Sequence, residues 1–268
     1  RAWRAGDTAG RRRRRGVALM LVLWLVVVLG AIGGGVVRQA RAASGIALNA
    51  RARIIARYAA ESGIEALVAG IEDTLALLAD PGARQDWLNR RERSSSEGDS
   101  VILGSGRFAV AVIDVAARLD MNATTADGLR VFFAQFTDAF TADGIAAGIR
   151  AHVEQRRPAD AGGPGDPLRP ARPLRSLEEL RALDLVPEGV LTLAAPYLTV
   201  DGDGTLNRRR ASDTVLVAAG GELRDEPTRL LLVSRGWMAG NALTHEVQAV
   251  YDVTMDRLAL VHWRERSR

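Results

Sequence analysis

The chain has 268 residues, of which 47% are hydrophobic and 25% charged, a composition that excludes intrinsic disorder and allows one or two folded domains. Cysteine is absent, which excludes disulfide scaffolds, thiol catalysis and cysteine-based zinc sites. Residues 1–16 carry a net charge of +6, against +4 for the whole chain, so the remaining residues carry −2 and the basicity is a terminal feature rather than a nucleic-acid-binding surface.

An uncharged stretch of 21 residues, 17–37, directly follows Arg11–Arg15. A helix of this length spans roughly 30 Å, the thickness of a bilayer core, and basic residues remain on the cytoplasmic side. The pattern therefore predicts a retained transmembrane helix with its N-terminus in the cytoplasm. A cleaved signal peptide is the alternative, with Ala40-Arg41-Ala42 imitating its site, but the apolar part of such a signal is only about 7–15 residues long. A buried core helix is disfavoured because the stretch is apolar on all faces.

The helix is expected to continue beyond the membrane as an amphipathic periplasmic stalk over residues 38–80. No proline interrupts residues 38–79, and the larger apolar residues recur at multiples of three or four. Asp80-Pro81-Gly82 is expected to end the helix, and Gly33–Gly35 to loosen it near the membrane.

The next segment combines a strand with helices. Arg107–Val115 is rich in alternating apolar and β-branched residues, which predicts a strand. Thr124 with Asp127 is expected to cap a helix that runs to about Phe140, and Thr141 to begin another.

A pair of short helices is predicted between residues 176 and 193. Ser176 and Glu179 have the spacing of a capping box, and Pro187 is expected to open the second helix. Some helix-hairpin-helix pairs bind DNA phosphates through a glycine-rich hairpin. Here the hairpin reads Asp184-Leu185-Val186-Pro187, with an acid where a phosphate would sit, so we expect a packing or partner surface and no nucleic acid.

Strands are predicted again towards the C-terminus, after a turn at Asp201-Gly202-Asp203-Gly204 that we interpret as a hairpin. The last two strands are expected to be joined by Met255-Asp256-Arg257 in a meander. The predicted strands are Val215–Ala218, Arg229–Arg235, His245–Thr254 and Leu258–Arg264. A helical block between strands predicts an α+β fold with a helical insertion in a sheet.

Sites for catalysis or metal binding are not evident in the sequence. His152, His245 and His262 lack partners at metal-ligand spacing, and we expect each to be a surface or sheet residue. Asp201-x-Asp203 is similar to a calcium loop, but Leu206 and Ser212 stand where an EF-hand requires glycine and glutamate. Neither a nucleophile elbow nor a P-loop is present. We therefore predict no enzyme, no catalytic residue, no metal and no cofactor.

The order of arginines, Gly16, an uncharged membrane-length run and a long helix resembles the N-termini of type IV pilins and pseudopilins. The resemblance implies that a prepilin peptidase cuts between Gly16 and Val17, leaving residues 1–16 as the leader, and that Val17 becomes the methylated N-terminus. Most members have glutamate at the fifth mature position, where it pairs with the amine of the subunit already in the fibre. Here that position is Leu21.

A fifth position without glutamate is a property of the minor pseudopilin K family of type II secretion systems, whose members lie at the fibre tip. Residues 113–124 (IDVAARLDMNAT) resemble that family's D-E-A-x-R-L-N-L-N-T-A stretch, with Asn122 retained. Residues 175–180 and 195–200 resemble its S-x-E-E-L and P-Y-L-T-V stretches, and 261–265 its terminal strand. Simple drift of the apolar run is the alternative reading of Leu21.

Two departures from the family concern its acidic loop and a later motif. The family binds calcium and usually has a long acidic loop, whereas Glu154–Arg175 is short and holds only Glu154, Asp160 and Asp166 as acids. A calcium site is therefore not carried over. The N-V-N-T-A stretch of the family is replaced by Leu206–Arg210.

The resemblance implies a pilin-like antiparallel sheet with an inserted helical, SAM-like domain. The expected segments are a leader (1–16), a transmembrane helix (17–37), its periplasmic continuation (38–80), the first part of the sheet domain (101–119), the inserted domain (120–196) and the rest of the sheet (197–268). The expected function is capping of the pseudopilus with I-type and J-type minor pseudopilins, in support of protein export across the outer membrane. A minor pilin of a type IV pilus is the alternative, and a membrane-anchored enzyme or sensor is a third.

Overall fold

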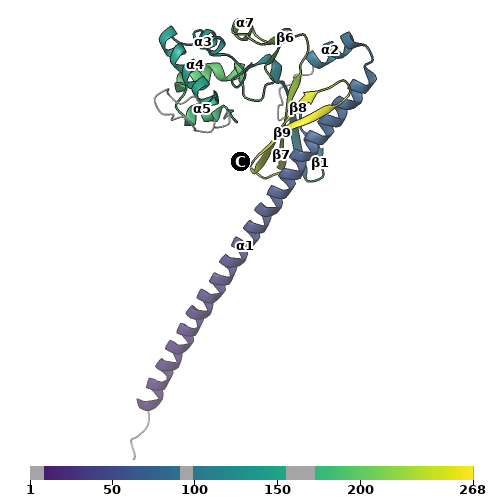
Figure 1. Cartoon of the computed structure of the whole chain (residues 1–268). Coiled ribbons are helices and arrows are strands. Elements are labelled where there is room, and N and C mark those ends of the chain that lie inside the picture. Colours follow the sequence, from purple (N-terminus) through teal and green to yellow (C-terminus); the bar gives the residue numbers. More distant parts are fainter. Residues whose placement is uncertain (1–8, 91–98, 155–172, 268) are drawn as a thin grey trace, which may run out of the picture. The chain divides into compact units, whose positions relative to one another are not determined.

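The computed structural model describes residues 9–90, 99–154 and 173–267, with side chains from Leu19 onward. These residues belong to two compact units, 1–54 and 55–268. The long helix α1 (Ala9–Leu77) makes up the described part of the first unit and contributes its last residues, from Ile55, to the second. The predicted α+β class, with a long N-terminal helix and an antiparallel sheet, is confirmed (Figure 1).

The second unit is built on a five-stranded antiparallel sheet in the order β1-β2-β7-β8-β9. Its strands are β1 (Val101–Leu103), β2 (Gly106–Asp114), β7 (Arg229–Met238), β8 (Thr244–Val253) and β9 (Leu258–Ser267). The predicted strands at 107–115, 229–235, 245–254 and 258–264 are all present, and β7, β8 and β9 form the predicted meander.

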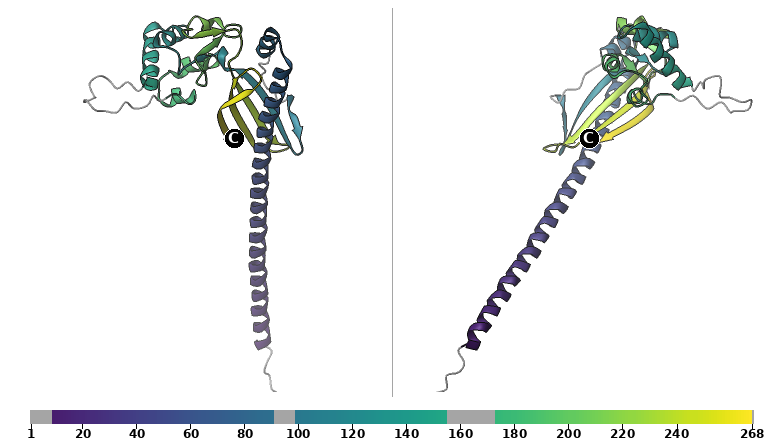
Figure 2. Two further views of the ribbon diagram at one scale, coloured as in Figure 1. Left: turned by 45° about the vertical axis from the view of Figure 1, so that its right-hand side comes forward. Right: turned by 90° about the vertical axis from the view of Figure 1, so that its left-hand side faces the viewer.

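The last part of α1 packs along one face of this sheet (Figure 2). Its buried residues recur every three or four positions, which places them on one side of the helix. They contact the alternate side chains of the central strands that point to the same face. The helix contributes Ala60, Ile64, Leu67, Ile71 and Leu75, and the sheet Val112, Leu230, Leu232, Val247, Ala249, Tyr251 and Leu258.

Two glycines let the helix and the sheet approach closely. A Cβ at Gly63 would lie 2.9 Å from Cδ2 of Phe108 and closer still to Oγ of Ser234. On β7, a Cβ at Gly236 would lie 2.5 Å from the backbone nitrogen of Ala60. A side chain at either position requires the helix to move away from the strands.

The predicted end of the helix near Asp80 is confirmed, and a helix that the sequence analysis did not identify follows it. Helix α2 (Pro81–Asn89) has Asp80 as its N-cap, whose carboxylate accepts from the backbone nitrogen of Ala83 at 2.6 Å, and Pro81 at its first position. Asp80 and Pro81 therefore start a helix rather than only ending one.

A helical insertion joins β2 to β7. These strands are neighbours in the sheet, although 114 residues lie between the end of β2 at Asp114 and the start of β7 at Arg229. Its helices are α3 (Ala126–Phe133), α4 (Ala139–Glu154), α5 (Glu178–Ala182), α6 (Glu188–Ala194) and α7 (Asp213–Leu216). Two parallel strand pairs accompany them, β3 (Leu119–Asp120) with β4 (Leu198–Thr199), and β5 (Thr205–Asn207) with β6 (Glu222–Arg224). The predicted helical block inside a sheet is confirmed.

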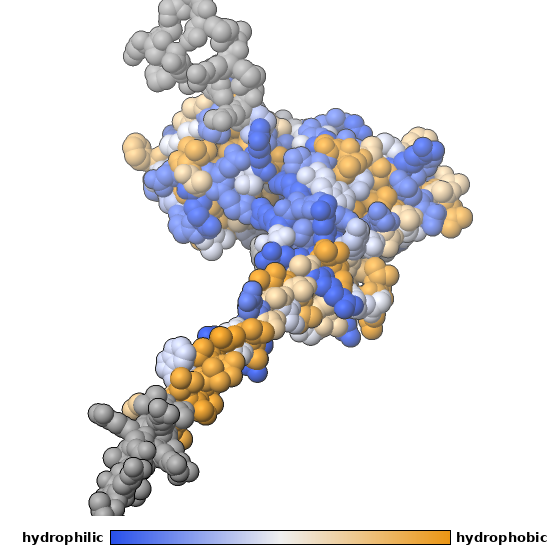
Figure 3. Space-filling view, turned by 90° about the horizontal axis from the view of Figure 1, so that it is seen from below, coloured by the Kyte–Doolittle hydropathy of each residue, from blue (hydrophilic) through white to orange (hydrophobic). Residues whose placement is uncertain are grey.

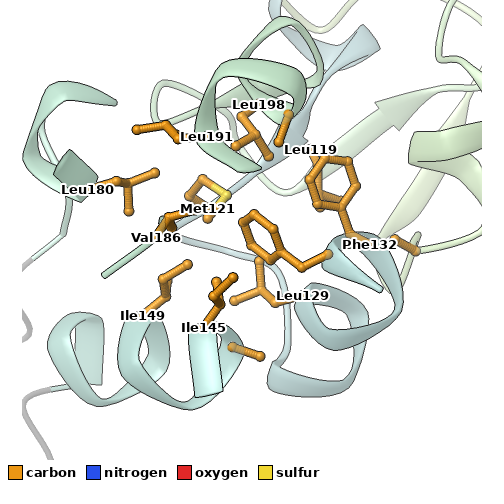
Figure 4. Packing of buried hydrophobic residues seen from close by; sticks show 14 of the residues in the cluster. Leu119, Met121, Leu129, Phe132, Ile145, Ile149, Leu180, Val186, Leu191 and Leu198 are labelled. Atoms are coloured by element: carbon orange, nitrogen blue, oxygen red, sulfur yellow. The ribbon is translucent and has the colours of Figure 1, made fainter. Parts of the chain in front are cut away.

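The insertion has its own hydrophobic core (Figure 4). Phe132 and Phe133 are fully buried and meet edge to face, with ring centroids 5.1 Å apart. Leu129 comes from the same helix, α3, and Ile145 and Ile149 from α4. The apolar faces of α3 and α4 are therefore buried in this core.

Several local predictions within the insertion are wrong. Thr125, not Thr124, caps α3, and the helix ends at Phe133 rather than near Phe140. The next helix starts at Ala139, where Asp138 accepts from the backbone nitrogen of Thr141 at 3.0 Å, so the aspartate takes the role expected of the threonine.

The capping box at Ser176 is also wrong. Helix α5 starts after Leu177 without a side-chain cap, and Glu179 accepts from the backbone nitrogen of Arg175 at 3.2 Å instead. Pro187 does precede the second helix of the pair, α6, as predicted.

Two predicted β features near residues 201–218 are replaced by other structure. Residues 215–218 were expected to be a strand, but Asp213–Leu216 is helix α7, because Ser212 starts a helical turn that buries Val215. The loop 201–204 is not a hairpin, since the strands on its two sides pair with different partners. Short apolar runs do not distinguish strand from helix.

Asn122 joins three segments of the insertion. Its amide nitrogen donates to the carbonyl oxygens of Leu174 at 3.0 Å and Val200 at 2.9 Å, and its amide oxygen accepts from the backbone nitrogen of Leu174 at 2.8 Å. Arg150 donates to the carbonyl oxygens of Asn122 and Thr124 at 3.1 and 2.6 Å. The family-like asparagine thus has a structural function in this chain.

We predict that Gly63→Ala lowers the free energy of unfolding by about 1–3 kcal/mol, because the new methyl group overlaps Phe108 and Ser234. Gly70→Ala is the matched control on the same helix, since nothing lies within 4 Å of its added Cβ, and it should raise stability by about 0.5–1 kcal/mol. Urea unfolding of the full chain in detergent, followed by tryptophan fluorescence, measures both. Equal stability of the two variants would contradict the close packing.

We predict that Asn122→Asp costs about 3 kcal/mol or more, because two carbonyl oxygens lose their donor and face a carboxylate. Asn241→Asp should leave stability within about 0.5 kcal/mol, since the side chain of Asn241 acts as an acceptor, from the backbone nitrogen of Leu243 at 2.9 Å. Thermal unfolding compares the two, and an undisturbed Asn122→Asp variant would show that the three bonds contribute little.

Candidate functional site

The most prominent functional feature of the first unit is an apolar helical surface. Over the described residues, α1 contains an 18-residue window with a mean hydropathy of 2.6, none of which is buried. Leu19, Met20 and Leu23 are each more than two-thirds exposed. Figure 3 shows hydrophobic side chains covering this part of the helix. By length and composition this is a candidate membrane-spanning helix.

The predicted processing residues lie on the same helix. Gly16 and Val17 have helical backbone, and their side chains lie outside the described residues. Leu21 is 62% exposed, so its side chain is available to lipid or to another helix. Cleavage after Gly16 and methylation of Val17 stay predictions.

Three glycines leave a part of the surface of this helix without side chains. Gly30, Gly33 and Gly34 have nothing within 4 Å of the place where a Cβ would lie. Small residues at such positions allow helices to approach closely in lipid.

The three histidines are distributed as surface and sheet residues. His152 is half-buried on α4 and His262 is exposed on β9. His245 is buried on β8, where Nε2 lies 3.3 Å from a carboxylate oxygen of Glu265 and Nδ1 lies 2.9 Å from the hydroxyl of Ser267. Among residues 9–90, 99–154 and 173–267, no three histidine or acidic side chains come together as a metal site would require.

The acidic loop 201–204 is held by arginines. Arg229 donates to the carbonyl oxygens of Asp201 and Gly202 at 3.0 and 2.8 Å and pairs with Asp252 at 2.6 Å. Arg264 pairs with the carboxylate of Asp201. Of the two carboxylates in the Asp201-x-Asp203 pattern, that of Asp201 thus pairs with a guanidinium group, and Oδ1 of Asp203 accepts from the backbone nitrogen and the hydroxyl of Thr205 at 3.0 and 2.7 Å. Asp160 and Asp166 of the shortened acidic stretch lie outside the described residues.

Two carboxylates beside this loop have opposite pKa shifts. Burial raises the pKa of Asp120, which is only 6% exposed, although backbone N–H groups of Asn122 and Ala123 partly offset the effect. Burial would also raise the pKa of Asp203, but the hydroxyl and backbone N–H of Thr205 outweigh it, and the net shift of the pKa is downward.

An ion pair joins the two helices of the hairpin between α5 and α6. Asp184 has a left-handed backbone with φ of 51°. It lies in the hairpin at the place where DNA-binding helix-hairpin-helix pairs are rich in glycine. Arg181 is bound to Glu188 through two contacts of 2.6 Å, which join α5 to α6. The hairpin is stabilised by its own ion pair.

A buried amide network was missed by the sequence analysis. Asn207 is fully buried, and its amide nitrogen donates to the side-chain oxygens of Asn89 at 2.8 Å and Asp114 at 2.7 Å. These residues come from β5, α2 and β2, so the network joins the insertion to the sheet. Only the long-range fold brings them together, and no local pattern marks them.

The chain has a distant likeness to a solved structure. No protein-family model matches the chain, and no curated protein matches it. A solved structure that is similar is a chain of the crystal structure of the GspK–GspI–GspJ complex from the type II secretion system of enterotoxigenic Escherichia coli. The two share 15% sequence identity with a TM-score of 0.48, over 78% of this chain and 98% of that one. A likeness this distant does not establish a function for the present chain.

We predict opposite pH responses for Asp120→Asn and Asp203→Asn. The raised pKa of Asp120 means that its contribution to stability is most favourable at low pH and is lost as the pH rises through the folded pKa. Asp120→Asn should therefore be more stable than the parent at pH 7 and lose that advantage below pH 3.8, the ordinary pKa of aspartate.

The pKa of Asp203 is shifted in the opposite direction, downward. Its lowered pKa gives stability that is present above the ordinary value and lost as the pH falls through the folded pKa, so Asp203→Asn should be less stable than the parent at pH 7. Melting temperatures between pH 3 and 8 measure both variants. A loss of stability at pH 7 in Asp120→Asn would contradict the assignment.

Proposed function

We propose that this protein is a minor pseudopilin of a type II secretion system, which caps the pseudopilus together with I-type and J-type minor pseudopilins. The observation that carries the proposal is the order of Arg11–Arg15, Gly16 and the uncharged residues 17–37, in a helix whose later part packs on an antiparallel sheet. The resemblance of residues 113–124 and 195–200 to the K family supports it independently of the leader.

The proposed location is the inner membrane, with a single span. Residues 17–37 cross the bilayer, the arginines stay on the cytoplasmic side, and residues 38–268 lie in the periplasm. A prepilin peptidase removes residues 1–16 and exposes Val17. The apolar exposed surface of Leu19–Val37 supports the span.

Leu21 supports a leading position in the fibre. A charged side chain within the bilayer is costly unless it is paired, and a subunit that enters the fibre first has no predecessor whose amine could pair with a glutamate. A leucine at this position avoids that cost. In this proposal, Leu21 lets the chain enter the fibre first, while its amine remains available to the next subunit.

The helical insertion supports the capping role. It fills the sequence between β2 and β7 with about 114 residues and a core of its own, a bulk that the sheet itself does not require. In the proposed assembly, this insertion prevents further subunits from adding beyond the tip. The proposed activity is structural, and no reaction is assigned to the chain.

We predict that Gly16→Leu in the native host leaves the leader attached and abolishes secretion of exoproteins. Gly10→Leu, in the same leader, is the matched control and should be processed normally. Mass spectrometry of the purified protein should find N-methylated Val17 in the parent and the control. Processing and secretion that are unaffected by Gly16→Leu would overturn the proposal.

Deletion of the gene separates the proposal from its alternative. A type II pseudopilin is required for exoprotein release, whereas a minor pilin of a type IV pilus is required for twitching or adhesion. Loss of twitching with normal exoprotein release would favour the pilus.

A further inference from the structure

A basic depression lies between the helical insertion and the sheet face that α1 does not cover. Leu231, Gln248, Arg264 and Arg266 form its sheet side, and they share one face because their positions alternate with those packed under α1. Ser176–Glu178, Leu198–Asp201 and Arg118 complete the lining. The depression has a volume of about 160 Å³.

Arginine dominates the charge of this depression. Its lining contains three arginines and two acids, Glu178 and Asp201, which leaves a net charge of +1. Arg266 is 37% exposed and makes one contact with Glu178, between Nη1 and Oε1 at 3.2 Å. A guanidinium group has five N–H donors, so this contact uses only a part of the Arg266 fork.

Arg264 is a second arginine in the lining of the same depression. Its Nη1 donates to the carbonyl oxygen of Arg175 at 2.9 Å, and Nη2 pairs with Asp201. Its Nε is buried and has no acceptor among the described residues. Buried charged donors without an acceptor are costly, and a nearby anion reduces that cost.

The lining also selects the kind of anion. Leu177, Leu198, Val200 and Leu231 provide an apolar wall suited to a short aliphatic stem. Glu178 and Asp201 disfavour a doubly charged phosphate, whereas a planar carboxylate matches a guanidinium fork.

We propose that this depression binds a single carboxylate group carried on a short aliphatic stem. An acidic side chain of a partner polypeptide and a small free carboxylic acid share this chemistry. The inference depends only on residues 118–266 and stands or falls separately from the secretion role.

The test is a titration of the ¹⁵N-arginine-labelled full chain in detergent micelles, followed through the Nε–H signals of Arg264 and Arg266. The probes are butyrate, the peptide acetyl-Ala-Ala-Glu-Ala-Ala-amide and inorganic phosphate. Saturable shifts of both signals with butyrate or the peptide, and weaker ones with phosphate, are expected. Tighter binding of the peptide identifies a polypeptide source, and tighter binding of butyrate a free acid.

Matched variants locate the binding. Arg266→Gln should weaken butyrate binding about tenfold, the loss expected for one charge-assisted hydrogen bond. Arg235→Gln is the control, because Arg235 is on the same sheet and pairs with Glu246 at 3.2 Å, outside the depression. Ser176→Trp fills the depression without removing an arginine and should abolish binding with little change in melting temperature. Absence of saturable shifts, tighter phosphate binding, or equal effects of Arg266→Gln and Arg235→Gln would overturn the inference.

Discussion

The structure depends on one constraint, which is that an uncharged helix of membrane length has to be removed from water. The large side chains from Leu19 to Val37 are almost all exposed within the first unit. Burying one such side chain stabilises a protein by about 1.5–3 kcal/mol, so leaving more than a dozen of them in water is untenable. A bilayer satisfies this constraint along the whole stretch, whereas a protein partner would have to surround it.

The same helix has a different character in the second unit. From Ile55 onward its buried apolar residues lie on one side of the helix and pack against the sheet. The small residues at positions 63 and 236 set how closely the helix and β7 approach. The helix therefore changes along its length from all-round hydrophobicity in the first unit to one-sided hydrophobicity in the second.

The elements that could be predicted from the sequence are those formed by interactions between residues close together in the chain. The strands β7 to β9 were predictable because alternation, a tight turn and sheet order all lie within a local stretch. Helix α7 was missed because the four apolar residues 215–218 fit either a strand or a helix, and the serine at its start, Ser212, makes no side-chain cap. The parallel strand pairs were missed because their strands are only two or three residues long, and β3 and β4 also lie far apart in the sequence.

The candidate sites also differ in whether a local sequence pattern marks them. Gly16, Val17 and Leu21 were identifiable because a leader is a linear pattern, although the side chains of the first two lie outside the described residues. The basic depression was not identifiable, since Arg118, Ser176 and Arg266 meet only through the fold. The role of Asn122 was also hidden, because its three hydrogen-bonding contacts lie 52 and 78 residues away.

Membrane insertion of the apolar helix is the central claim, and single-cysteine labelling tests it most directly because the natural chain has no cysteine. Ala31→Cys lies within the apolar stretch, and Ser100→Cys lies just before β1. In right-side-out inner-membrane vesicles, an impermeant maleimide should label the cysteine at position 100 and leave the one at position 31 unmodified. Equal labelling of both, or release of the protein from the vesicles, would contradict the account.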